Sequence, residues 1–289
     1  MTLSVLIPIY NYNALQLVQN LHELVQREHI DAEIILADDA SSEHTEWFTN
    51  VRELPRVTLW QAPHNLGRAA IRNKLASLAQ GRWLWFVDCD TALTATFSFK
   101  AFLEAAKDAD VVCGGTTVPE DQPEGASLRY KYEYTSSRVA IHDRSQTPFH
   151  QLTTCNMLIR KSVFTSIQLC EEIKEYGYED ALFGAELERH QVSITHIQNP
   201  VIHLGLEPNN IFLDKTETAL RTLYSLGDRM QGYSRVQDTA KRLQRYGLSG
   251  FVRRCFSLIR KPLRKHLEGP NPNLTAFAFY KLGYYLTLN

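Results

Sequence analysis

The sequence predicts an α/β protein with a mixed, mostly parallel central sheet flanked by helices, followed by a helical extension. Over the first 210 residues, short apolar runs typical of buried strands alternate with segments whose apolar residues recur at helical spacing. From Thr216 onward the strand patterns stop and only helical patterns continue. We therefore predict one large domain at residues 1–210, with parts at 1–118 and 119–210, and a helical region at 211–289.

Composition excludes several classes of protein. The 289 residues carry 31 Lys and Arg against 32 Asp and Glu, so no excess of charge points to nucleic acid. Five scattered cysteines form neither a zinc-binding pair nor a disulfide framework, which favours a reducing compartment. The chain begins with a strand pattern, and no apolar run reaches the length of a membrane span. We expect a cytoplasmic protein that is soluble or peripheral to a membrane.

The first part of the chain reads as a succession of strands and helices. Apolar runs predict strands at 3–10, 33–37, 57–60, 83–87 and 110–118, and the intervening segments predict helices at 14–28, 43–52, 68–79 and 97–107. The glycines at 114 and 115 suggest a bulge or a close backbone contact within the last of these strands.

The second part begins with a polar excursion at residues 119–150, which we expect to be partly helical and to cover the site. Strands are predicted at 153–159, 192–197 and 200–205, and helices at 161–167, from Glu179, and at 214–228, 234–246 and 249–267. The tail at 277–288 is rich in tyrosine and leucine, so we expect it to pack on another element.

Paired acids stand where strands end. Asp88 and Asp90 follow the apolar strand at 83–87, at the carboxyl end where open α/β sheets hold their ligands. A divalent cation that itself holds phosphates would relieve their repulsion; the alternative is a capped strand-to-loop turn. Asp38 and Asp39 follow the second strand in the same way, with capping of a helix as the alternative.

Other polar residues have a functional and a structural interpretation as well. Arg68 and Arg72 share a helix face and suit a phosphate or a carboxylate, or are solvated surface arginines. Glu179 and Asp180 open a helix, where the helix dipole alone favours acids. His203 is either a core histidine or a metal ligand at a strand end.

The order of these motifs resembles the family 2 glycosyltransferases, which have the GT-A (Rossmann-like) fold. The resemblance covers about residues 3–205 and rests on Ser4–Asn11, Asp38–Ser41, Asn65–Asn73 and Gly81–Asp90, with Glu179-Asp180 and His203 closing the series. The chain departs from the family in two places: Ala40 stands where glycine is frequent, and Thr91 stands where a further aspartate is frequent. The second departure restricts the acidic metal-site candidates to Asp88 and Asp90.

The resemblance implies a nucleotide pocket in the part at 1–118. Pro8 and Tyr10 would border it, Asp39 would accept a hydrogen bond from the base, expected to be uracil, and Arg72 would lie near the nucleotide. Asp88 would face the ribose or the sugar.

The resemblance also implies the catalytic and metal-binding residues. Asp90 and His203 would bind Mn²⁺ or Mg²⁺, and Asp180 would be the catalytic base, with Glu179 beside it as a support or acceptor contact. A cation that neutralises the diphosphate and a carboxylate that takes the proton of the acceptor hydroxyl suit a single displacement. We therefore expect an inverting transferase that uses a nucleotide-sugar, with a glycan or lipid-linked glycan as acceptor.

Two other functions are open at this point. A nucleotidyltransferase would usually have a glycine-rich, basic loop after the first strand, whereas residues 10–13 contain neither glycine nor lysine. A non-catalytic sugar-nucleotide-binding subunit is the other alternative, and the retained Asp90, Asp180 and His203 argue against it.

The segment at 251–267 carries several cations, no acid, and apolar residues at every fourth position. Such a basic amphipathic helix can lie on an anionic membrane, or it can pack its apolar side on the catalytic domain. Pro262 is expected to kink or end this helix.

Overall fold

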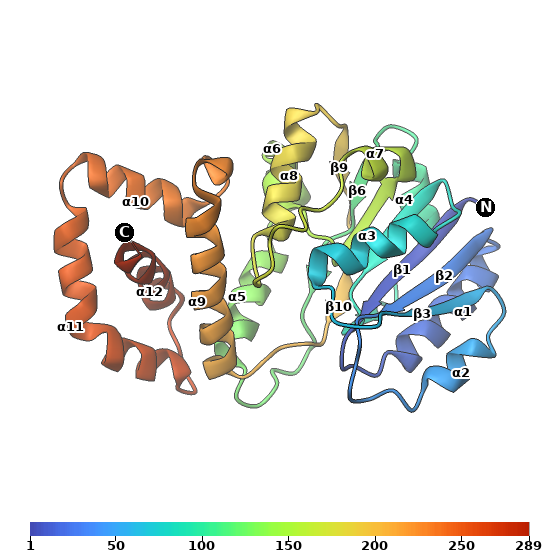
Figure 1. The fold of residues 1–289 in the computed structure, drawn as a ribbon, viewed down its shortest axis with the longest axis horizontal. Coiled ribbons are helices and arrows are strands. Elements are labelled where there is room, and N and C mark those ends of the chain that lie inside the picture. The colour runs from blue at the N-terminus through green and yellow to red at the C-terminus, as the bar shows by residue number, and fades with distance from the viewer. Residues whose placement is uncertain (289) are drawn as a thin grey trace. The chain divides into compact units, whose positions relative to one another are not determined.

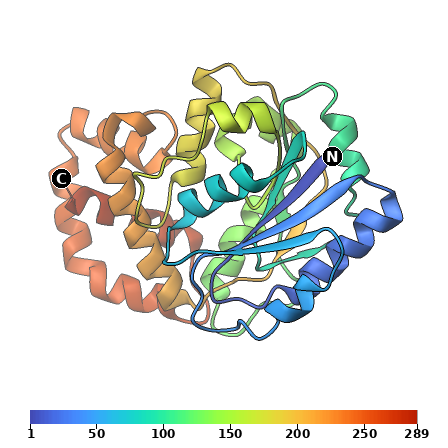
Figure 2. The same cartoon turned by 45° about the vertical axis from the view of Figure 1, so that its right-hand side comes forward.

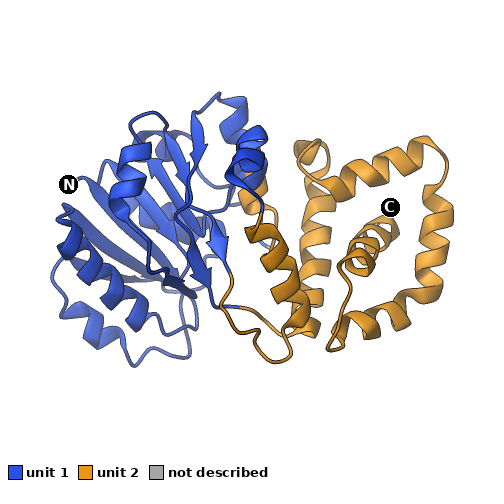
Figure 3. Ribbon diagram, turned by 180° about the vertical axis from the view of Figure 1, so that it is seen from behind, with its two compact units in different colours: residues 1–117, 139–174, 183–205 blue, residues 118–138, 175–182, 206–289 orange. Residues whose placement is uncertain are grey.

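The computed structural model describes residues 1–288, which form two compact units that interleave along the chain (Figure 3). The first unit comprises residues 1–117, 139–174 and 183–205, and the second comprises residues 118–138, 175–182 and 206–288. The chain passes from the second unit to the first inside one helix, α8 (Glu179–Arg189), after Leu182. Each unit has its own core and is described by itself.

A seven-stranded sheet forms the centre of the first unit (Figure 1). Its strands, in the spatial order β3-β2-β1-β4-β8-β6-β9, are β3 (Val57–Gln61), β2 (Ala32–Asp38), β1 (Leu3–Ile9), β4 (Trp83–Val87), β8 (Asn156–Arg160), β6 (Val111–Cys113) and β9 (Ile194–His196). Strand β8 runs antiparallel to both its neighbours, and the other pairs are parallel. The predicted mixed, mostly parallel sheet is therefore confirmed.

Helices cover both faces of this sheet (Figures 1 and 2). Leu3, Val5 and Ile7 of β1 share a core with α1 (Leu15–Glu28), α2 (Phe48–Arg52) and α4 (Phe99–Ala105). Leu6 faces a second core, with α3 (Arg68–Leu78), α7 (Lys161–Ser166) and the later part of α8. Side chains alternate between the faces of a strand, so burial on both sides explains the continuous apolar run of β1.

The β1–β4 boundary is the point at which the strand order reverses. The β1–β4 ladder ends at Leu6 and Phe86, whereas the β1–β2 ladder continues to Ile9 and Asp38. Pro8, which lies beyond the last β1–β4 pair, has no N–H to donate and is compatible with this opening. Open α/β sheets bind ligands at such a switch point, outside the carboxyl ends of the strands.

A small second sheet adds to this edge. Its order is β5 (Thr91–Leu93), β10 (Val201–His203) and β7 (Thr116–Thr117), and its pairing places His203 opposite Thr91. The sequence did not predict β5, and the single strand predicted at 110–118 is wrong, because Gly114 and Gly115 interrupt it. A Cβ on Gly114 would overlap the amide of Asn156, and Gly115 has a φ of +81°, so the predicted close backbone contact is present.

The second unit is helical. It contains α5 (Ser127–Ser137), α9 (Asn209–Leu226), α10 (Arg235–Arg245), α11 (Ser249–Glu268) and α12 (Leu274–Thr287), with a 3₁₀ turn at Gly227–Met230. The tail forms α12, whose Phe277 and Tyr280 are buried, and Gly283 leaves room for Phe256 of α11. This confirms that the tail packs on other elements.

Helix α11 does not end at Pro262 but continues to Glu268. Figure 1 shows that α11 is bent, and a proline inside a helix is a common cause of a bend. Phe256 and Leu267, one on each side of Pro262, are both buried. Their packing offsets the cost of about 3 kcal/mol that an internal proline imposes. No helix within residues 1–288 is long and apolar enough to span a membrane.

Candidate active site

Polar residues gather at the carboxyl ends of β1, β2 and β4 in the first unit. Asp39 follows β2 and is 5% exposed. Its Oδ1 accepts a hydrogen bond from the backbone N–H of Leu66 at 2.6 Å, and its Oδ2 accepts one from Gly67 at 3.0 Å. Asp39 therefore fixes the loop that begins α3, and each of its oxygens retains a second lone pair for a ligand.

Asp38 has a local role instead. Its Oδ1 accepts a hydrogen bond from the backbone N–H of Ser41 at 3.1 Å, which caps a turn. The predicted helix at 43–52 is too long, because α2 begins only at Phe48, so Asp38 does not cap a helix. The turn includes Ala40, whose φ of +61° is in the left-handed region. Glycine adopts this conformation more easily than alanine, which explains why glycine is frequent at this position in the family 2 glycosyltransferases.

The buried Arg72 forms an ion pair with the partly buried Asp88. The Arg72 side chain is 4% exposed, and its Nη2 donates to Oδ1 of Asp88, while Nη1 donates to the carbonyl of Arg68 at 3.0 Å. Arg68 adds a second, longer contact of 3.9 Å to Asp88. Burial raises the pKa of Asp88, but the two arginines outweigh burial and hold the pKa below its ordinary value. Arg68 and Arg72 are thus not simply solvated surface arginines.

Replacing Arg72 with glutamine is expected to destabilise the protein by about 3–5 kcal/mol at neutral pH, because it leaves the Asp88 carboxylate, which is only 18% exposed, without its main partner. Because the pKa of Asp88 is lowered in the folded protein, its ion pair stabilises the fold at pH values above the ordinary pKa of 3.8. This stabilisation is lost as the pH falls through the folded-state pKa. The deficit of Arg72→Gln should therefore shrink in acid, which urea unfolding at neutral and acidic pH would measure.

Arg56→Gln is the matched control, since Arg56 is 62% exposed and pairs with Asp31 on the surface. It should cost less than about 1 kcal/mol. A loss of stability in Arg72→Gln as small as that in Arg56→Gln would contradict the assigned ion pair. A large loss that did not change with pH would contradict it as well.

Asp90 and His203 meet at the same edge. Nε2 of His203 lies 3.3 Å from Oδ2 of Asp90, and the backbone N–H of Leu204 donates to the carbonyl of Asp90 at 2.8 Å. A Cβ on Gly205 would overlap the Asp90 carboxylate, so glycine is required for this approach. His203 ends β10, and Asp90 directly precedes β5. The pairing of these two strands brings the two residues together although they are distant in sequence.

This pair fits a small divalent cation. Two ligands bound side by side to one cation, each at about 2.1 Å, lie about 3 Å apart, and carboxylate oxygen and imidazole nitrogen both suit Mn²⁺. Within residues 1–288, no group of three or more His, Cys, Asp or Glu side chains is arranged to hold a metal. The remaining ligands would therefore come from substrate phosphates and water, as is usual for Mg²⁺ sites.

Two neighbours of Asp90 were not predicted from the sequence. Burial, with Asp90 and Asp88 adding to it, raises the pKa of Cys89 to about 12, so this thiol stays protonated. Burial and then Asp90 raise the pKa of Tyr12, which follows β1. The only sequence signal for Tyr12 was its place at a strand end, because its proximity to Asp90 depends on the β1–β4 pairing.

Glu179 and Asp180 lie in the second unit, in the first turn of α8. The backbone before them is unusual, since Gly177 has a φ of +106° and Tyr178 a φ of +67°. Gly177 packs directly on Ala219 of α9, and Thr222 donates to the carbonyl of Tyr176 at 3.1 Å. Backbone held in sparsely populated conformations is concentrated at functional sites.

Gly177→Ala is expected to destabilise the protein by about 2–5 kcal/mol, because the new methyl group meets Ala219 and alanine is strained at this φ. It should also lower kcat, since the clash moves the start of α8. Thermal unfolding and steady-state kinetics would measure both effects.

Gly125→Ala is the matched control, because Gly125 has a φ of +74° and no heavy atom lies within 4 Å of the added Cβ. It should cost only about 1–2 kcal/mol and leave kcat unchanged. Equal effects of the two substitutions would show that the contact with Ala219 does not position the segment.

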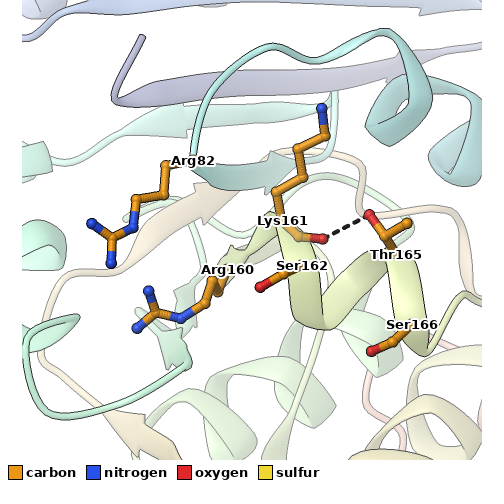
Figure 4. A pocket seen from close by; sticks show the side chains of 6 residues that line it. All are labelled: Arg82, Arg160, Lys161, Ser162, Thr165 and Ser166. Carbon is orange, nitrogen blue, oxygen red and sulfur yellow. Dashed lines mark hydrogen bonds between the residues drawn. The ribbon is translucent and has the colours of Figure 1, made fainter.

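A cavity of about 710 Å³ lies at another edge of the first unit and is lined by Arg82, Arg160, Lys161, Ser162, Thr165 and Ser166 (Figure 4). Lys161 points away from the two arginines (Figure 4) and donates to the carbonyl of Ala79 at 2.5 Å, and Arg160 is bound to Asp110 at 2.6 Å. Trp83, at the amino end of β4, pairs with Arg160 in the sheet, so this cavity lies opposite the Asp88 edge. It contains no acid and does not belong to the candidate site.

The fold, with acidic residues at its strand ends, is that of a transferase of the GT-A type. The family model described as "Glycosyl transferase family 2" matches residues 4–167, and the chain belongs to this family. The chain is 25% identical over 211 residues to the "Putative teichuronic acid biosynthesis glycosyltransferase TuaG" of Bacillus subtilis (strain 168), which covers 66% of this chain and 81% of that protein. The protein is thus a glycosyltransferase.

Solved structures with the same fold include S. aureus TarS 1–349 in complex with UDP, at a TM-score of 0.54 and 18% identity, covering 99% of this chain and 89% of that chain. The complex of the same protein with UDP-GlcNAc has a TM-score of 0.53 at 18% identity and covers 99% and 90% of the two chains. These similarities establish the GT-A fold, as the resemblance implied.

Proposed function

We propose that the protein transfers a sugar from a uridine diphosphate sugar to an acceptor hydroxyl in the synthesis of a cell-surface polysaccharide, with Mn²⁺ or Mg²⁺ as cofactor. The observation that carries the proposal is the Asp90–His203 pair next to the Asp88–Arg72 ion pair, at the carboxyl edge of β4. TarS has been captured with UDP and UDP-GlcNAc, and TuaG is described as a teichuronic acid enzyme, which supports this donor and this pathway class.

We assign the donor nucleotide to residues 1–118. Pro8 and Tyr10 border the opening between β1 and β4, and the Tyr10 ring, which is 54% exposed, is available to stack on a base. Asp39 would accept a hydrogen bond from the uracil through its remaining lone pairs. Asp88, whose charge is already neutralised by Arg72, would face the ribose or the sugar. Residues 119–210 would then provide the acceptor part.

Asp90 and His203 would hold the cation, which when bound neutralises the diphosphate and so makes it a better leaving group. Asp88 is less suited to this task because Arg72 occupies it. Asp180 takes the proton of the acceptor hydroxyl, and Glu179, 9% exposed, supports the first turn of α8 beside it. One base and one displacement invert the anomeric configuration.

The test is a transfer reaction monitored for UDP release and for the anomeric configuration of the product by proton NMR. We expect UDP release that depends on the divalent cation and stops with EDTA, and a product of inverted configuration. Retention of configuration would contradict the single displacement, and full activity in EDTA would contradict the role of the Asp90–His203 pair.

We also propose that α11 contacts an anionic membrane at the cytoplasmic face, where a lipid-linked acceptor would lie. Phe256 and Leu267 pack inward, but Phe251 and Leu258 are 69% and 78% exposed. The exposed cations Arg253, Arg254 and Lys261 lie on the same helix. Arg260 lies on the same helix and is bound to Glu217 within the second unit. An exposed face with apolar and basic residues suits an interface with anionic lipid.

Reversing the charges of Arg253, Arg254 and Lys261 to glutamate is expected to abolish salt-sensitive binding to vesicles that contain anionic lipid. Each cation near such a surface contributes about 1 kcal/mol, so binding should weaken by at least about 100-fold. Cosedimentation at low and high salt would measure it. Reversal of the exposed Arg27, Lys100 and Lys107 in the first unit is the control, and equal loss in both triple variants would refute a specific contact through α11.

A further inference from the structure

An arginine that has no part in the proposed mechanism lies near the catalytic edge of the first unit. Arg144 belongs to α6 (Ile141–Gln146), and its Nη1 lies 2.5 Å from the position that a Cβ on Gly115 would take. Gly115 directly precedes β7, where Thr116 pairs with Val201 of β10, two residues before His203. In the seven-stranded sheet β8 separates β4 from β6. Asn156 of β8 pairs with Val87 and accepts a hydrogen bond from the N–H of Gly114, so Gly115 is about two strand spacings, or roughly 10 Å, from Asp88.

Arg144 lacks the carboxylate partner that the other buried or half-buried arginines among residues 1–288 have. Arg72 binds Asp88, Arg129 binds Glu133, Arg160 binds Asp110 and Arg264 binds Asp214. Among residues 1–288, the side-chain partner of Arg144 is the neutral amide oxygen of Gln198, at 3.4 Å, and its buried Nε has no hydrogen-bond partner. Burial lowers the pKa of Arg144, but an arginine stays charged in proteins. Partial burial of a cation without a neighbouring anion costs free energy. Such a cation is expected where a bound ligand supplies the negative charge.

The surface beneath this guanidinium is rigid. Asn156 donates to the carbonyl of Gly115 at 2.7 Å and to that of Asn199 at 2.9 Å, and its Oδ1 accepts from Nε1 of Trp85 at 2.9 Å. Because position 115 is a glycine, no side chain stands between the guanidinium and the strand. The nearby His196 is buried, and burial and then Arg144 lower its pKa, so it adds no competing charge.

We propose that Arg144 binds an anionic group, a carboxylate or a phosphate, on one of the two sugar substrates. A guanidinium accepts such a group through two parallel hydrogen bonds, which gives charge selectivity and orientation. Gly115 is about two strand spacings from Asp88, which would face the ribose or the sugar, so Arg144 lies within reach of a sugar at this edge. The inference rests on the proposed function, because it needs a sugar substrate at this edge.

The test has a donor arm and an acceptor arm, each with the wild-type chain, Arg144→Gln and Arg138→Gln. Arg138 is a suitable control because it is a neighbouring arginine that stacks on Tyr134. In the donor arm, calorimetry with Mn²⁺ compares UDP-glucuronate with UDP-glucose. In the acceptor arm, NMR titration of the UDP-loaded protein compares methyl glucuronide and glucose 6-phosphate with methyl glucoside. Thermal unfolding checks that each variant is folded.

We expect the anionic sugar to bind at least about 10-fold more tightly than the neutral one in one arm, which identifies the substrate that carries the charge. Arg144→Gln should remove this difference and Arg138→Gln should retain it. No preference in either arm, or a preference that survives Arg144→Gln, would overturn the inference while normal binding of UDP-glucose still supported the proposed function. Failure of every UDP-sugar to bind would overturn both.

Discussion

Replacing Asp180 with asparagine is expected to lower kcat by at least about 1,000-fold and to leave the affinity for the donor nearly unchanged. The amide cannot take the proton of the acceptor hydroxyl, and positioned general bases contribute about 100- to 10,000-fold to rates. The substitution conserves the shape of the side chain in the first turn of α8, so the fold should persist. Steady-state kinetics and calorimetric titration of the UDP-sugar would separate the two parameters.

Asp228→Asn is the matched control, since Asp228 is in the second unit, 88% exposed, and paired with Lys241. It should retain full activity. If Asp180→Asn lost donor binding while it remained folded, Asp180 would be a donor-binding residue and the base would have to be sought elsewhere, with Glu179 as the first residue to test.

The second large effect is expected from Asp90→Asn. Asp90 is the charged member of the pair that would hold the cation, and neutralising the diphosphate charge is worth several kcal/mol in the transition state. We expect kcat/KM to fall at least about 1,000-fold. The metal-dependent part of donor binding should also disappear, so EDTA should have no further effect on the affinity of the variant for UDP.

Asp110→Asn provides the control for this charge change, because Asp110 also pairs with a cation, Arg160, but lies at the other end of the sheet. It should leave kcat/KM and the effect of EDTA as they are in the wild type. An Asp90→Asn variant that still bound UDP in a metal-dependent way would exclude Asp90 as a ligand of the cation.

The strands were predictable from the sequence where burial alone dictates them. Strands β1 and β4 are buried on both faces, so their apolar runs stand out, and their predicted ends agree with the structure within a residue. Strand β5 is only three residues long and was missed, and β6 and β7 were predicted as one strand. Their limits are set by contacts of Gly114 and Gly115 with Asn156 and Arg144, which are distant in sequence.

The candidate site was predictable in its residues but not in their partners. The acids Asp39, Asp88 and Asp90 are apparent at the ends of strands, yet only the fold joins Arg72 to Asp88 and His203 to Asp90. Asp39 was expected to accept a hydrogen bond from a base, and the structure shows that it also accepts hydrogen bonds from two backbone N–H groups. Tyr12 and Arg144 were not predicted because neither belongs to a motif, and each depends on tertiary packing.

The most direct test of the proposed function is a thermal-shift screen of UDP-, GDP-, CMP- and dTDP-sugars, each with Mn²⁺ and with EDTA. A ligand that binds only the folded protein stabilises it and so raises Tm. At a ligand concentration of about 100 times Kd the stabilisation is about 2.7 kcal/mol. We expect a rise with UDP-sugars that requires Mn²⁺ and is absent in Asp90→Asn. A rise with another nucleotide class, or one that persists in EDTA, would contradict the proposed donor or the proposed metal site.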